Sequence, residues 1–237
     1  VKPLAKEAAL AYWNGTITGE TSYFDSYSSN SLKITNIYSN KKGFGELKKI
    51  KNRDKIADPL LKRQLEILYN NYLSNQADTL ILKEIIDRSA ALEQKYASFR
   101  ANYKGKEISD NEVESILRSS VNNKDLEEAW KAHKLIGPFV ANDVIELIKL
   151  RNQVAKSLGF DNYHAMSLEL SGQNPAQISS LFDELDSLTK DTFAALKREM
   201  DASFSKKYGV KESELMPWHY QGRFFQESPQ LYPVDLD

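Results

Sequence analysis

Cysteine is absent from the 237 residues of this sequence. That absence excludes disulfide bonds, thiolate zinc sites, iron–sulfur clusters and a cysteine nucleophile within the chain. An excess of either charge is also missing, since 32 Lys and Arg residues stand against 33 Asp and Glu residues. A nucleic-acid-binding protein needs a basic face to neutralise phosphates, so we expect no nucleic-acid partner.

Long apolar runs are absent too. No stretch reaches the roughly 18 residues that a membrane-spanning helix requires, so we expect no membrane span. The chain begins at Val1 instead of Met, and it ends at Asp237 in a stretch typical of a loop. We expect both ends to be cut from a longer chain.

The sequence motifs of several enzyme classes do not occur. These are the Gly-x-Ser-x-Gly elbow, the Walker loop, the Gly-x-Gly-x-x-Gly turn and the His-Glu-x-x-His zinc helix. His133, His164 and His219 each lie alone in the sequence, although three such side chains could converge in space. We interpret each as a core or surface histidine, and we expect neither a bound metal nor a catalytic residue in this chain.

Apolar residues recur at three- and four-residue spacing along almost the whole chain, which is typical of amphipathic helices. Helix starts are indicated by the capping-box spacing of Ser109 and Glu112, by Asp161, and by the cap-then-proline pairs at 58–59 and 174–175. These features predict an all-α protein of eight or nine helices. The predicted helices are one ending near residue 13, 21–38, one following 58–59, 79–100, one from 109–112, 125–136 and 143–158 with an interruption at 137–138, one after 161, and 178–208.

The longest predicted helix carries an apolar face that we expect to point inward. Its members are Leu181, Leu185, Leu188, Thr192, Ala195, Leu196 and Met200. Gly159 and Gly209 are expected to end helices, and Gly105 to form a turn or a short extended excursion within 103–108.

No repeat or low-complexity linker divides the chain, so we expect one helical region over residues 1–237. The best internal boundary is Asn40-Lys-Lys-Gly-Phe-Gly45, which a loop explains equally well. The basic stretch from Lys48 to Arg53 is short and lacks interleaved aromatic residues. We therefore interpret it as a solvated helix face, not as a phosphate-binding patch.

Aromatic residues are concentrated between Pro217 and Pro229, outside any obvious amphipathic helix. One interpretation is the wall of a concave binding site; the other is an irregular connector that plugs the end of the helical core. The composition favours neither. The candidate cleft residues are Trp218, His219, Tyr220, Arg223, Phe224 and Phe225.

Several strings occur in the order found in a family of zinc peptidases. They are LAYWNGTITGE at 10–20, DPLLKRQL at 58–65, EAW at 128–130, LRNQVAKSLGFDNY at 150–163, PWHYQ at 217–221 and FFQE at 224–227. Together they make the chain resemble the amino-terminal half of the bacterial relatives of angiotensin-converting enzyme, which are peptidyl-dipeptidases. More distantly, it resembles thimet oligopeptidase and oligoendopeptidase.

The resemblance implies an almost entirely helical fold with a deep cleft between two halves, of which this chain would form the lid side. In that family a His-Glu-x-x-His helix and a later Glu hold the zinc, and those elements would lie after Asp237. We therefore expect zinc in the full-length parent and none in this chain, which alone would be inactive. The implied partners are the carboxy-terminal catalytic half and a peptide substrate, and the bacterial cytoplasm and the periplasm or cell envelope both remain open as compartments.

Two functions follow from these features. In the first, the chain is the non-catalytic amino-terminal part of a zinc-dependent peptidase and shapes its peptide-binding cleft. In the second, it is a freestanding helical scaffold that holds a peptide or protein against the wall from Trp218 to Glu227. The ordered run of strings favours the first.

Overall fold

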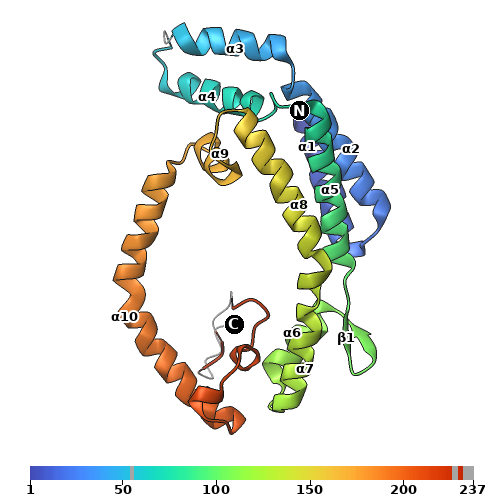
Figure 1. Cartoon of the computed structure of the whole chain (residues 1–237), viewed down its shortest axis with the longest axis vertical. Helices are drawn as coiled ribbons and strands as arrows, with labels where there is room; N and C mark the ends of the chain where they lie inside the picture. Colours follow the sequence, from blue (N-terminus) through green and yellow to red (C-terminus); the bar gives the residue numbers. More distant parts are fainter. Residues whose placement is uncertain (54–55, 226–228, 232–237) are drawn as a thin grey trace. The chain divides into compact units, whose positions relative to one another are not determined.

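A computed structural model of the chain describes residues 1–53, 56–225 and 229–231, and these residues are mostly helical (Figure 1). This confirms the all-α prediction. The α-helices are α1 (Lys2–Thr18), α2 (Thr21–Tyr38), α3 (Lys41–Arg53), α4 (Pro59–Leu73), α5 (Thr79–Ser98), α6 (Asp110–Ser119), α7 (Asn123–Lys134), α8 (Ile136–Ser157), α9 (Tyr163–Leu170) and α10 (Pro175–Tyr208). Among them, none combines the length and the apolar character that crossing a bilayer requires.

The chain divides into two compact units. Unit 1 comprises Val1–Ser98 and Val140–Ser180, and unit 2 comprises the described residues of Phe99–Phe139 and Leu181–Asp237. None of these borders lies near residues 40–45. The loop predicted there is wrong, because α3 begins at Lys41 and takes both glycines into its first turns. The prediction of a solvated helix face from Lys48 to Arg53 is confirmed, since these residues are exposed on α3.

Side-chain caps explain where three helices begin. The Asp58 carboxylate accepts from the Leu60 N–H at 2.8 Å, and the Asn174 side chain accepts from the Ala176 N–H at 2.9 Å. The capping box at Ser109 is also complete, since the Glu112 carboxylate accepts from the Ser109 N–H at 2.7 Å. Each cap satisfies a backbone donor that the helix itself leaves free.

The predicted cap at Asp161 is wrong by one residue. Asn162 has the extended backbone of a cap, and its side-chain oxygen accepts from the Ala165 N–H at 2.9 Å. Asp and Asn are both good N-caps, so residue type alone does not show which of the neighbours Asp161 and Asn162 caps the helix.

Two further boundaries differ from those predicted. Helix α1 continues past residue 13 to Thr18 and ends at Gly19, whose φ of 74° is left-handed. Helix α8 begins at Ile136, well before residue 143, so Gly137 and Pro138 lie within its first turn. Proline is tolerated there because the first N–H groups of a helix have no intrahelical acceptor.

The excursion predicted around Gly105 is a two-stranded hairpin in unit 2. Strand β1 (Ala101–Tyr103) pairs antiparallel with β2 (Lys106–Ile108), and Ala101 lies opposite Ile108. Lys104 and Gly105 connect the strands with φ values of 52° and 80°, as tight hairpin turns require. Ala101 and Ile108 are buried, so the hairpin closes one side of the core.

The core of unit 2 supports the candidate site. It is formed by Val113 and Leu117 of α6, Leu126 of α7, and Phe204 and Tyr208 at the end of α10, all of them buried. Trp218 and Tyr220 pack against this cluster. The segment after α10 therefore packs against buried residues of α6, α7 and α10.

The inward face predicted for α10 is wrong over most of its length. Met200 is buried, but Leu181, Leu185, Leu188 and Leu196 are exposed. The buried residues of this helix are Met200, Phe204 and Tyr208. Amphipathic spacing predicts an apolar face, whereas burial also requires a neighbour, and the described part of unit 2 supplies one only at the last turns.

In unit 1, α1 and α2 approach closely because α1 presents Ala8, Ala11 and Gly15 to its neighbour. A Cβ at Gly15 would lie 3.0 Å from Cε2 of Phe24, a ring that is itself buried. The absence of a side chain at Gly15 thus makes room for the Phe24 ring.

We predict that Gly15→Val destabilises the chain by about 1–3 kcal/mol, because the added atoms overpack the Phe24 contact. The matched control is Gly45→Ala, where a Cβ meets no atom within 4 Å. This control should stabilise the chain by about 0.5–1 kcal/mol, since alanine favours the helix. Urea unfolding followed by circular dichroism measures both changes, and equal effects at the two glycines would contradict the packing argument.

Candidate functional site

The six candidate residues lie in unit 2, on the segment that follows α10. The 3₁₀ turn η1 (Glu212–Glu214) leads to a second turn, η2 (Pro217–Tyr220), which carries the first three candidates. Gln221 ends this turn with a φ of 61°, is buried, and accepts from the Gln230 N–H through Oε1 at 3.1 Å. Of the predicted wall, Gln226, Glu227 and Ser228 lie outside the described residues.

His219 points into unit 2 and is only 3% exposed. Its Nδ1 accepts from the Met216 N–H at 2.8 Å, so Nε2 carries the proton and donates to Asn123 Oδ1 at 3.3 Å. Burial lowers the pKa of His219 below its ordinary value. With both ring nitrogens engaged in a neutral ring, this histidine packs the turn in place and offers no free base.

Trp218 is half-buried beside it. Its ring centroid lies 5.9 Å from that of Trp130 on α7 and 5.8 Å from that of His219. Tilted aromatic pairs at this spacing are favourable beyond the area they bury. Trp218 and His219 thus fasten the turn to α7.

Tyr220 is held by an ionic pair on α10. Its hydroxyl donates to Asp201 Oδ1 at 2.6 Å and accepts from Lys197 Nζ at 2.8 Å, and Lys197 pairs with Asp201 at 2.5 Å. Burial, together with the Asp201 bond, raises the pKa of Tyr220 above its ordinary value. Burial alone would raise the pKa of Asp201, but the bonds from Lys197 and Tyr220 prevail and lower it.

Arg223 is held by α6. Its Nη1 lies 2.5 Å from Asp110 Oδ2 and its Nε lies 3.0 Å from Glu114 Oε2. Burial alone would lower the pKa of Arg223, but the bonds and charges of the two carboxylates raise it. Lys134 Nζ also donates to the Arg223 carbonyl oxygen at 2.6 Å, so both the side chain and the backbone of this residue are fixed.

His133 completes this cluster from α7. Its Nε2 accepts from Arg223 Nη1 at 3.3 Å, and burial lowers its pKa. Its Nδ1 is buried without a hydrogen-bond partner among the described residues. A neutral ring avoids placing another cation next to Arg223 and Lys134.

The last two candidates face outward. Phe224 stands edge-on against His133 with ring centroids 5.4 Å apart, and Lys134 Nζ lies 4.6 Å from its ring. Phe225 is 54% exposed, has a φ of 57°, and stands edge-on to Tyr220. Together with Met216, these two rings are apolar side chains that the segment leaves open to solvent.

A cavity of about 550 Å³ lies beside Phe225 and Tyr220. Apolar side chains of α10 and of the following segment form most of its wall, among them Phe193, Leu196 and Met216. Lys197 and Tyr220 supply the polar groups. Such a site suits an apolar side chain or a ligand with one polar end.

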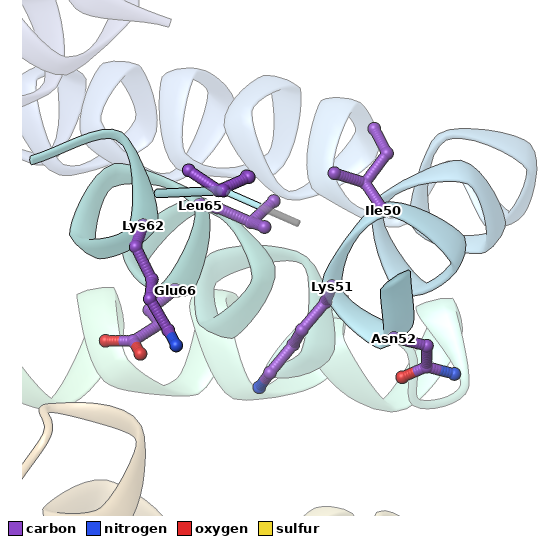
Figure 2. A pocket seen from close by; sticks show the side chains of 7 residues that line it. Ile50, Lys51, Asn52, Lys62, Leu65 and Glu66 are labelled. Carbon is purple, nitrogen blue, oxygen red and sulfur yellow. The ribbon is translucent and has the colours of Figure 1, made fainter. Parts of the chain in front are cut away.

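Unit 1 has a smaller cavity, of about 320 Å³, between α3 and α4 (Figure 2). Lys51, Lys62 and Glu66 place charges of both signs around it, and Ile50 and Leu65 are apolar residues of its lining. Lys51 Nζ also lies 4.0 Å from the Tyr69 ring centroid. The described lining residues of the cavity include no pair arranged as nucleophile and base.

Zinc ligation does not fit the residues described. No group of three His, Asp or Glu side chains within residues 1–53, 56–225 and 229–231 is arranged to hold a metal ion. We therefore assign no step of zinc chemistry to these side chains.

None of the residues that hold the candidates in place was predicted as a site residue, although His133 was interpreted as a core or surface histidine and is buried. They are Asp110 and Glu114 on α6, His133 and Lys134 on α7, and Lys197 and Asp201 on α10. Asp110 and Glu114 are four residues apart, as are Lys197 and Asp201, so each pair lies on one helix face. This spacing was the only sequence pattern from which the two pairs could have been found. Their partners in the later segment have no such local signal.

We predict that Asp201→Asn lowers the free energy of unfolding at neutral pH by about 1–2 kcal/mol, because it weakens charge-assisted bonds to Lys197 and Tyr220. The folded state lowers the pKa of Asp201 below its ordinary 3.8, so its contribution is present above that pH. It is lost as the pH falls through the lower, folded-state pKa, since the unfolded chain takes up the proton first. The difference between wild type and variant should therefore be constant above about pH 5 and shrink below pH 3.8.

The matched control for this series is Asp183→Asn, since Asp183 is exposed on the same helix. Urea unfolding at a series of pH values measures both. A difference at Asp201 that stays constant down to the lowest pH would contradict the role given to its carboxylate.

Comparison of the sequence with known proteins assigns the chain to a family. A search of curated proteins and a search of solved structures find no significant match to the chain. The sequence profile described as angiotensin-converting enzyme, of a peptidase family, matches residues 2–228. Because this match covers nearly the whole chain, including all six candidate residues, the chain belongs to the angiotensin-converting enzyme family of metallopeptidases.

Proposed function

We propose that this chain is the amino-terminal, non-catalytic part of a zinc-dependent peptidase, and that it shapes the cleft in which the peptide binds. The match to the family over residues 2–228 carries this proposal. In the proposed division of labour, the zinc ligands and the general base lie in sequence that follows residue 237. Zinc, when bound there, would activate water for attack on the peptide carbonyl.

The arrangement of the aromatic segment supports a role in binding without chemistry. Trp218, His219, Tyr220 and Arg223 are committed to contacts within unit 2, whereas Phe224 and Phe225 remain exposed. An exposed aromatic pair on a rigidly held turn can contact peptide side chains at little cost in conformational entropy. We propose that these two rings, with the cavity beside Phe225, form this chain's contribution to the cleft.

We predict that the 237-residue chain neither binds zinc at one equivalent nor hydrolyses peptides, whereas the protein encoded by its complete reading frame does both. Metal analysis after dialysis and hydrolysis of a quenched fluorescent peptide, each with and without a chelator, measure the two properties. Stoichiometric zinc and chelator-sensitive hydrolysis in the 237-residue chain would refute the division of labour. A reading frame that stops near Asp237 would instead favour the freestanding helical scaffold.

We predict that Phe225→Ala in the complete enzyme raises KM by several-fold and changes kcat little, because an exposed ring contributes to binding the ground state and transition state alike. Trp218→Ala is the matched control, since its ring packs between Trp130 and His219 and its loss should lower stability. Steady-state kinetics and thermal unfolding of both variants separate these effects. An unchanged KM in Phe225→Ala would show that this ring does not contact the peptide.

A further inference from the structure

One face of α10 exposes apolar side chains that the proposed function leaves unused. Leu181, Leu185 and Leu188 recur at helical spacing, and Phe182 and Phe193 flank them; all five are at least half exposed. Leu188 is 72% exposed. Single exposed apolar side chains need no explanation, but a contiguous group this large marks an interaction surface.

This face runs into the cavity beside Phe225. Phe193 belongs both to the apolar face and to the wall of that cavity, and Leu196, three residues further along α10, also lines the cavity. The cavity, at about 550 Å³, can accept a large apolar side chain from whatever covers the helix. The surface therefore consists of an exposed apolar stripe along the helix and the cavity beside Phe225 at one end of it.

The edges of the face are acidic. With 3.6 residues per turn, Glu184 and Asp191 lie along one edge and Asp186 along the other. Between Leu181 and Asp191 the only cation is Lys190. These three carboxylates have no ion-pair partner among the described residues, so an occupant that covers them without supplying cations would leave them desolvated and unpaired.

We propose that the face formed by Leu181, Leu185, Leu188, Phe182 and Phe193 docks an amphipathic helix with Lys or Arg along its edges, contributed by the catalytic part of the same enzyme. The inference rests on the proposed function, since it places the boundary between the two parts on α10. An apolar helix face fits the exposed apolar stripe, and basic edges match the carboxylates. A second copy of α10 fits less well, because it brings the same three carboxylates and only one cation, Lys190, between Leu181 and Asp191.

The absence of cysteine gives a direct test. Leu188→Cys places a single thiol on the face, and Ser187→Cys, the matched control, places one on the exposed opposite side of the same turn. Both are made in the 237-residue chain and in the complete protein. Maleimide labelling at each position is timed by mass spectrometry of the α10 peptide.

In the 237-residue chain we expect both thiols to react at similar rates. In the complete protein, Leu188→Cys should react at least about tenfold more slowly than Ser187→Cys, because the docked helix covers it. Equal rates in the complete protein would overturn the inference. Slow labelling of Leu188→Cys already in the 237-residue chain would also overturn the inference. If this protection depends on protein concentration, a second copy covers the face; if it does not, another part of this chain covers it. Protection that requires an added substrate peptide would assign the face to that peptide and overturn the inference too.

The charge complementarity is tested separately. Glu184→Lys with Asp191→Lys should raise the labelling rate of Leu188→Cys in the complete protein several-fold, whereas Asp183→Lys, on the opposite side, should leave it unchanged. Equal effects of both changes would contradict basic edges on the occupant. Peptide hydrolysis by the same samples keeps the two proposals apart: an active zinc enzyme with equal labelling rates refutes the docking face alone, and a protected but inactive, zinc-free protein refutes the proposed function.

Discussion

The guanidinium of Arg223 lies between the carboxylates of Asp110 and Glu114. This ion cluster fixes the position of the segment after η2 against α6. Breaking this partly exposed cluster would leave two neighbouring carboxylates without their shared cation, and like charges close together repel. Because Lys134 also binds the Arg223 carbonyl oxygen, the backbone is fixed together with the side chain. Phe224 and Phe225 are therefore exposed on a segment that has little freedom to move.

A second anchor works from the other side of the same segment. The bonds of Tyr220 to Lys197 and Asp201 tie it to α10, while Arg223 ties it to α6. Neither anchor uses a group that could attack a carbonyl or hold a metal in this geometry. Both position the aromatic rings of the segment that follows α10.

Local chemistry made much of the fold predictable. A cap at Asp58, Ser109 or Asn174 depends on residues within one turn, so its signal is complete in the sequence. Asp161 and Asn162 show the limit, because two good caps stand side by side. Gly43 and Gly45 were assigned to a loop because glycine weakens helices, yet helix α3 accommodates them.

The candidate site was predictable only in part, for a related reason. Aromatic residues clustered in one short segment, so they could be found without a structure. Arg223 and Glu114 are 109 residues apart, and no periodicity connects them. Likewise, the spacing along α10 identified an apolar face correctly but carried no information about what lies opposite, so its burial was predicted where the described structure leaves it exposed.

The left-handed backbone of Gln221 has a consequence for which residues this position can accept. Glycine would adopt the same φ with less strain, but it has no side chain to accept from Gln230. Asparagine tolerates the conformation as well, but its shorter side chain would fall short of that N–H. The turn thus imposes two requirements that few amino acids meet together, so we expect few substitutions at this position to keep both the backbone conformation and the hydrogen bond.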